Sequence, residues 1–108
     1  RLDLVLGSPG GPRIISAVFQ TIVNWIDHQL PLMEAVQSYR MHHQWVPDSI
    51  RIEKGALSLL EIAKLEEMGH KVEGTRRVGD VQAIARDGDA WLGVSDARSD
   101  GQPFAVIR

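Results

Sequence analysis

Five small residues, Gly7-Ser8-Pro9-Gly10-Gly11, separate a short apolar segment from a long amphipathic one. Glycine leaves the main chain bare, and consecutive N–H groups ahead of a helix can hold a negatively charged oxygen. That chemistry suits phosphate binding or an oxyanion hole, whose N–H groups stabilise the tetrahedral intermediate of acyl transfer. A plain tight connection between a strand and a helix would use the same residue types.

The phosphate interpretation fits this loop poorly. A phosphate-binding loop ends in Gly-Lys-Ser/Thr, whereas here Gly11 is followed by Pro12 and Arg13, and the dinucleotide pattern G-x-G-x-x-G is missing as well. An oxyanion hole needs only two aimed N–H groups, for which Gly10 and Gly11 are the candidates. The pattern therefore leaves an oxyanion hole and a plain connection as the open alternatives.

No nucleophile accompanies the glycine loop. The chain contains no cysteine, which excludes a thiol nucleophile, disulfides and thiolate metal sites. No serine lies in a G-x-S-x-G setting. An N-terminal nucleophile would require Ser, Thr or Cys at position one, which is occupied by Arg1.

Two further polar clusters have ordinary explanations. His42 and His43 are adjacent, so their rings rarely point the same way, and no metal-ligand spacing accompanies them. We therefore expect them to pack and form hydrogen bonds. Asp96, Arg98 and Asp100 are candidates for ligand binding, but the alternative that we favour is a solvated turn with one internal ion pair.

Composition indicates one globular domain of ordinary size. The chain has 108 residues, 44% hydrophobic and 24% charged, and a net charge of −2, which argues against a nucleic-acid partner. No apolar run approaches the roughly 20 residues of a membrane span, and no signal peptide is evident. Apolar alternation starts directly at Arg1, from which we expect a piece of a longer protein.

The hydrophobic pattern predicts an α+β or layered α/β domain with at least one antiparallel strand pair. Strands are expected at 1–6, 49–53, 71–77, 81–86, 91–94 and 103–107, and helices at 13–30, 32–38 and 56–68. Residues 39–47 are expected to form an ordered loop, residues 87–89 a hairpin turn, and Gly69 a left-handed helix cap.

The helix predicted at 13–30 carries a wide apolar stripe and one narrow polar line. The polar line consists of Ser16, Gln20, Asn24 and Asp27. Because the apolar stripe is wide, we expect this helix to be mostly buried between a sheet and another layer.

Several motifs, in order, resemble the C-terminal part of the small subunit of the γ-glutamyltranspeptidase family: LGSPGGPRII, NWIDHQLPLMEAV, RMHHQW, IEKG and GVSDARSDG. The match spans nearly the whole chain, and GSPGG-x-RI together with R-x-HHQ is more specific than either alone. The resemblance implies an N-terminal-nucleophile hydrolase with an αββα sandwich of mixed or antiparallel sheets and packed helices. In that family a precursor cuts itself, and the new N-terminal threonine of the small subunit attacks a γ-glutamyl carbonyl. The acyl group then passes to water, an amino acid or a peptide.

The resemblance also assigns site residues and partners. It places the oxyanion-hole amides at Gly10 and Gly11 and gives Gly7, Ser8 and Pro9 the shaping of the loop. It implies no metal or organic cofactor. The expected partners are a small γ-glutamyl substrate such as glutathione, the rest of the small subunit and the large subunit. The threonine would lie upstream, so we expect the isolated piece to be inactive and to self-associate, and the whole protein to be periplasmic or secreted.

Two residues depart from the family pattern. Tyr39 stands where the family usually has proline before the arginine of R-x-HHQ, and Ala97 stands where the late motif is usually S-D-P-R. Transferase, hydrolase and cephalosporin- or glutaryl-acylase activities therefore stay open. A non-catalytic α+β binding module is the alternative from another class, and the coding sequence upstream of Arg1 would distinguish it.

Overall fold

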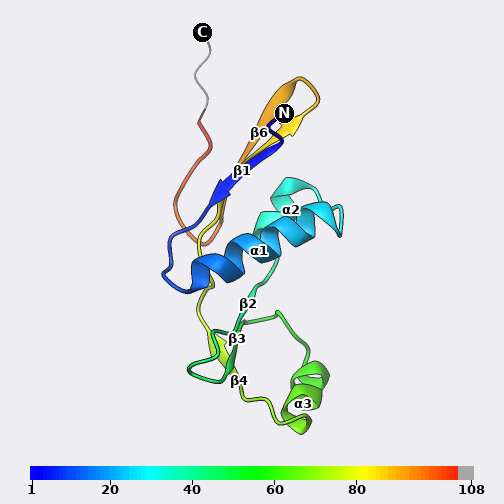
Figure 1. Cartoon of the computed structure of the whole chain (residues 1–108), viewed down its shortest axis with the longest axis vertical. Helices are drawn as coiled ribbons and strands as arrows, with labels where there is room; N and C mark the ends of the chain where they lie inside the picture. The colour runs from blue at the N-terminus through cyan, green and yellow to red at the C-terminus, as the bar shows by residue number, and fades with distance from the viewer. Residues whose placement is uncertain (105–108) are drawn as a thin grey trace.

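The chain has the predicted α+β architecture, and its computed structural model describes residues 1–104. A sheet of β1, β5 and β6 lies at one end, α1 and α2 pack against one face of it, and a second sheet with α3 lies at the other end (Figure 1). The elements are β1 (Leu4–Gly7), α1 (Arg13–Ile26), α2 (Leu32–Gln37), β2 (Met41–His42), β3 (Ile50–Glu53), α3 (Leu59–Glu67), β4 (Val72–Thr75), β5 (Gln82–Asp87) and β6 (Ala90–Ser95).

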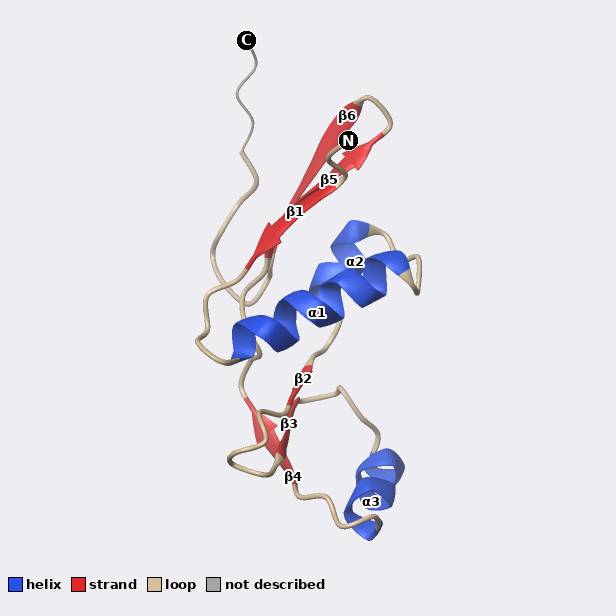
Figure 2. Ribbon diagram, in the orientation of Figure 1, coloured by secondary structure: helices blue, strands red, loops and turns tan. Residues whose placement is uncertain are grey.

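The first sheet is antiparallel, in the order β1-β5-β6 (Figure 2). Its register pairs Gly7, the last residue of β1, with Gln82. The β5–β6 hairpin closes at the pair Asp87 and Ala90, and Gly88 in the turn has a φ of 61°. The predicted hairpin turn is confirmed: its two residues are Gly88 and Asp89, and Gly88 supplies the positive φ that such a turn needs.

The second sheet is mixed, in the order β2-β3-β4. Strand β3 is antiparallel to β2 and parallel to β4, and α3 lies in the crossover between the parallel strands. Strand β2 falls inside residues 39–47, where we expected a loop, so that expectation was wrong. Two residues are too few to show periodicity, and Met41 and His42 become a strand because they pair with Ile52 and Arg51.

Helix α3 begins and ends on local signals. The Ser58 hydroxyl accepts the Glu61 N–H at 3.1 Å, and the Glu61 carboxylate accepts the Ser58 N–H at 2.9 Å. This capping box starts the helix at Leu59, later than the predicted residue 56. Gly69 has a φ of 96° and donates its N–H to the Glu66 carbonyl at 2.9 Å, which confirms the predicted left-handed cap.

Helix α1 is shorter than predicted and ends at Ile26. Gln29 has a φ of 54°, and the Leu30 N–H folds back onto the Asn24 carbonyl at 3.0 Å. A left-handed residue with such a returning hydrogen bond closes a helix. Pro31 therefore precedes α2 rather than ending α1.

The apolar stripe of α1 is only partly buried, so the expectation of a mostly buried helix was wrong for this chain. Ala17 and Thr21 are fully buried against the core. Ile15, Phe19 and Ile26 lie on the opposite side and are 77%, 64% and 56% exposed. Small residues form the fully buried part of the inward face of α1, and Trp25 packs against the core beside them, whereas the bulky Ile15, Phe19 and Ile26 face outward.

The polar line of α1 faces the rest of the chain. The Ser16 hydroxyl lies 2.6 Å from the Nδ1 atom of His42. The Gln20 amide donates to the Met41 carbonyl at 2.6 Å and accepts the Met41 N–H at 2.9 Å. These hydrogen bonds satisfy the free main-chain groups of β2 and attach that edge strand to the helix.

The hydrophobic core lies between α1, α2 and the first sheet. Its buried members are Ala17, Leu32, Val36, Val78, Val81, Ala83, Ala85 and Val94. No helix in residues 1–104 is long and apolar enough to cross a membrane. Of the strand expected at 103–107, Pro103 and Phe104 are not in a strand, and residues 105–107 lie outside the described part.

Candidate oxyanion site

The glycine loop turns sharply between β1 and α1. Gly7 still belongs to β1, and a Cβ atom built on it meets nothing within 4 Å. Gly10 has a φ of 133° and Gly11 a φ of 58°. Both angles lie in the region that favours glycine, so the two consecutive glycines are needed to make the turn.

The carbonyl groups of this turn point toward the helix. The Gly10 carbonyl accepts the Arg13 N–H at 3.2 Å, and the Gly11 carbonyl accepts the Ile14 N–H at 3.1 Å. In a trans peptide the C=O and the following N–H point in opposite directions, so the Gly11 N–H points away from the helix. Among residues 1–104, no acceptor is bonded to the N–H of Gly10 or of Gly11.

Ser8 anchors the loop from the other side. Its hydroxyl donates to the Pro9 carbonyl at 2.7 Å and accepts the Asp80 N–H at 2.8 Å. The Pro9 carbonyl and the Gly10 N–H belong to the same trans peptide and point in opposite directions. Because the carbonyl points toward the Ser8 hydroxyl, the Gly10 N–H points away from it. Two exposed, unbonded amides thus stand next to each other ahead of α1, where the helix dipole adds to their attraction for negative charge.

Gly79 fills a position that the sequence analysis did not single out. It is buried, with a φ of 71°, and its Cα lies 3.6 Å from a Cβ built on Gly10. A Cβ on Gly79 itself would lie 2.5 Å from the Ala17 Cβ and 2.8 Å from the Ser8 hydroxyl. The segment after β4 therefore packs directly beneath the glycine loop. The sequence did not reveal this contact, because a single glycine in a loop is not informative about what packs against it.

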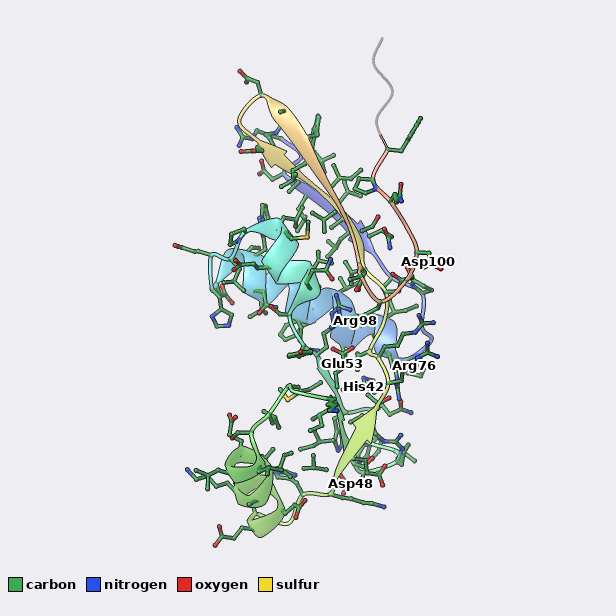
Figure 3. All side chains as sticks on the ribbon, turned by 180° about the vertical axis from the view of Figure 1, so that it is seen from behind. His42, Asp48, Glu53, Arg76, Arg98 and Asp100 are labelled. Atoms are coloured by element: carbon green, nitrogen blue, oxygen red, sulfur yellow. The ribbon has the colours of Figure 1, made fainter. Side chains whose placement is uncertain are left out.

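Four charged residues form a buried network below α1 and α2. Arg40 donates to Asp96 at 2.8 Å, and Arg98 donates to Asp96 at 3.0 Å and to Glu53 at 2.7 Å through Nε, with a second bond to Glu53 through its NH2 group. Figure 3 shows Glu53 and Arg98 side by side in this region. The expected internal ion pair is present, since Arg98 bonds Asp96 within the turn, but the expectation of a solvated turn was wrong, because Asp96 is only 1% exposed and is also bonded by Arg40 from a distant segment.

Hydrogen bonds keep both carboxylates of the network ionised. Burial by itself would raise the pKa of Glu53, but bonds from Arg98 and from the Val78 and Arg40 N–H groups outweigh it and lower that pKa. Burial likewise opposes ionisation of Asp96, and bonds from the Val81 N–H and from both arginines hold its pKa below the usual range. Residues 78–81 lie beneath the glycine loop, and hydrogen bonds from Val78 to Glu53 and from Val81 to Asp96 connect them to this network.

His42 is buried and forms hydrogen bonds, as expected. Its Nε2 atom lies 2.9 Å from the Gln44 side-chain oxygen, an acceptor, so Nε2 carries the proton. Its Nδ1 atom then accepts from the Ser16 hydroxyl at 2.6 Å. Within the described residues, no group of three or more His, Asp or Glu side chains is placed to hold a metal ion.

Comparison with known proteins gives the family. The family model for gamma-glutamyltranspeptidase matches residues 1–106. The chain belongs to the γ-glutamyltranspeptidase family. It is 47% identical over 97 residues to the glutathione hydrolase proenzyme of Escherichia coli K12, an alignment that covers 89% of this chain and 17% of the relative. It is 38% identical over 108 residues to the acylase ACY 1 proenzyme of Pseudomonas sp. V22, covering 98% of this chain and 19% of that protein.

Solved structures of γ-glutamyltranspeptidases share the fold. The enzyme from Pseudomonas nitroreducens, solved in complex with L-DON, matches with a TM-score of 0.88 and 40% identity, over 97% of this chain and 56% of that chain. The α+β assignment and the predicted N-terminal-nucleophile hydrolase fold agree with this similarity. The chain spans about a fifth or less of the length of these two curated relatives.

One departure from the family pattern has a visible local role. Ala97 stands where the family usually has proline, and its N–H donates to the Gln37 side-chain oxygen at 2.9 Å. The Gln37 amide in turn donates to the Ser95 carbonyl at 3.0 Å. Proline has no N–H, so the alanine adds a hydrogen bond between α2 and the loop after β6.

Proposed function

We propose that this chain is the C-terminal part of the small subunit of a γ-glutamyltransferase-type enzyme, with residues 1–108 forming one domain. The whole enzyme would transfer or hydrolyse the γ-glutamyl group of glutathione and related amides. The observation that carries this proposal is the pair of adjacent, unbonded amides of Gly10 and Gly11 ahead of α1. Membership in the family supports it.

In this proposal the chain's role is electrostatic. A threonine hydroxyl from upstream of the chain forms a bond to the γ-carbonyl carbon, and the carbonyl electron pair moves to oxygen. The N–H groups of Gly10 and Gly11 donate to that oxyanion. Its collapse breaks the C–N bond, and the amine leaves with the proton that the threonine hydroxyl gave up. Water or an acceptor amine then attacks the acyl ester in the same way, and the threonine oxygen leaves with the proton of that nucleophile. Loss of one such donor typically lowers kcat about 10²- to 10³-fold.

The first test reads the coding sequence upstream of Arg1 and then expresses the complete polypeptide. We expect an in-frame threonine at a cleavage point within about one domain length upstream. The mature protein should release p-nitroaniline from γ-glutamyl-p-nitroanilide, and the 108-residue chain alone should not. Turnover by the isolated chain, or a start codon directly before Arg1, would contradict the proposal and favour a non-catalytic binding module.

An acylase is the second candidate, because the similarity to the acylase ACY 1 proenzyme extends over 98% of the chain. A glutaryl amide lacks the α-amino group of a γ-glutamyl amide and otherwise has the same acyl chain. We expect the complete polypeptide to prefer the γ-glutamyl compound. Faster turnover of the glutaryl compound would assign the protein to the acylases.

Two points about the whole protein are part of the same proposal. The rest of the small subunit and the large subunit would be the partners of this chain, and the mature protein would be periplasmic or secreted. Fractionation of cells that express the complete polypeptide tests the location, and recovery in the cytoplasmic fraction would contradict it.

A further inference from the structure

A pocket of about 320 Å³ adjoins the glycine loop. Its lining includes Pro9, Gly10, Arg13, Arg76, Arg77 and Asp80. Arg13 is the first residue of α1, whereas Arg76 and Arg77 directly follow β4. Two segments more than 60 residues apart in sequence therefore contribute three arginines to the lining of one pocket beside Gly10, which we call the arginine pocket.

The arginine pocket has an excess of positive charge. Within residues 1–104, none of its three arginines forms a salt bridge with a carboxylate. Arg13 donates instead to the Thr75 hydroxyl at 2.8 Å and to the Arg77 carbonyl at 2.7 Å. The Asp80 carboxylate is engaged by the Ser99 hydroxyl at 2.9 Å and by the Gln82 amide at 3.0 Å. Like charges gathered in this way favour an anion between them.

Arg76 is the arginine that is available to a ligand. It is exposed, and no hydrogen-bond partner contacts its guanidinium in the described part of the chain. Arg13 and Arg77 are held by the bonds to Thr75 and to the Arg98 carbonyl, which lies 2.9 Å from Arg77. Figure 3 shows Arg76 close to the start of α1. A planar guanidinium with free donors suits a carboxylate, which it can bind with two hydrogen bonds.

The distance from the loop to the pocket suits the leaving side of a peptide-like substrate. An extended chain spans about 3.3–3.6 Å per residue, so the carboxylate of a leaving dipeptide lies roughly 7 Å from the scissile amide. Gly10 belongs both to the glycine loop and to the lining of the pocket, so the pocket begins directly at the place where Gly10 and Gly11 would hold the scissile carbonyl.

We propose that the arginine pocket binds the free carboxylate of the departing amino acid or dipeptide, with Arg76 as the residue that determines this specificity. This inference rests on the proposed function. An acceptor amino acid or peptide carries the same carboxylate and would bind in the same pocket before it attacks the acyl ester. The pocket would thus favour donors and acceptors that end in a free carboxylate over those that are neutral there.

The test compares glutathione with its C-terminal amide in the complete polypeptide. Removing one charge-assisted hydrogen bond corresponds to about a tenfold change in binding. We expect Arg76→Gln to raise KM for glutathione about tenfold, to leave kcat nearly unchanged and to leave KM for the amide and for γ-glutamyl-p-nitroanilide unchanged. Arg76→Lys keeps the positive charge and should therefore raise KM for glutathione less than Arg76→Gln does. Lys64→Gln removes the same charge from α3 and serves as the control.

Two results would overturn the inference: an equal effect of Arg76→Gln on glutathione and its amide, or no effect on either. If the wild-type protein turns over no γ-glutamyl donor, the proposed function fails separately. Calorimetric titration of the same protein with glycylglycine and with glycylglycine amide then tests the pocket directly. Tighter binding of the free acid that is lost in Arg76→Gln would support the pocket, and equal binding of the two would contradict it.

Discussion

Replacement of Gly79 by alanine should displace the glycine loop. The residue has a φ of 71°, where a side chain costs about 1–2 kcal/mol. Its new Cβ would lie 2.5 Å from the Ala17 Cβ and 2.8 Å from the Ser8 hydroxyl, contacts that backbone shifts must relieve. Overpacking of this kind typically costs about 1–3 kcal/mol, so we expect a total loss of about 2–5 kcal/mol.

Gly88 provides a matched control for the conformational part of that cost. It also has a positive φ, 61°, but a Cβ built on it meets nothing within 4 Å. Gly88→Ala should therefore lose only about 1–2 kcal/mol. In urea unfolding of the complete polypeptide, the difference between Gly79→Ala and Gly88→Ala measures the steric effect.

Activity separates a local displacement from general destabilisation. Because Ser8 anchors the loop through Asp80, a shift at Gly79 should lower kcat by up to about 10²-fold, whereas Gly88→Ala should leave kcat unchanged. Adding Ala17→Gly to Gly79→Ala removes the Ala17 Cβ that lies 2.5 Å from the new side chain. It should therefore partly restore both the free energy of unfolding and kcat. Equal losses of stability and of kcat in Gly79→Ala and Gly88→Ala would refute the reasoning, as would a double variant in which Ala17→Gly restores neither.

Three further predictions concern the buried network and the exposed surface. Asp96→Asn leaves Arg40 buried without its ionised partner and should cost about 3–5 kcal/mol in urea unfolding, whereas exposed Asp100→Asn should change little. Folding lowers the pKa values of Glu53 and Asp96, so the stabilisation from their ionised forms is complete only above pH about 5. It is lost progressively as the pH falls from there through the lowered values, and unfolding midpoints measured at decreasing pH should show a loss that Asp96→Asn reduces. The isolated 108-residue chain should self-associate through its exposed apolar residues, and a compact monomer in sedimentation would contradict this.

Features encoded within a few residues of sequence were predicted correctly. The turn at Gly88, the cap at Gly69 and the glycine loop before α1 all follow from which residues tolerate a positive φ. The family followed from motifs in their order along the chain, and the family match confirms it. The assignment of the oxyanion amides to Gly10 and Gly11 stays a prediction, for which the free N–H groups are the supporting observation.

The orientation of α1 was not predictable from its own residues. Helical periodicity sorts side chains onto faces, but it does not say which face meets the rest of the chain. Gln20 and Ser16 face inward because β2 presents unpaired main-chain groups and a buried histidine there. Ile15 and Phe19 face outward, although a pattern of hydrophobicity would place them inside.

The sequence by itself determined the turns, the caps and the family, because each depends on the conformational preferences of adjacent residues or on linear motifs. Only the tertiary structure decided what the loop rests on and which charges meet. Ser8 and Asp80 are 72 positions apart, and Arg40 and Asp96 are 56 apart. Contacts at such separations depend on the path of the whole chain. Gly79 and the turn that contains Asp96 support the candidate site only because the fold buries them beneath the glycine loop and beside Arg40.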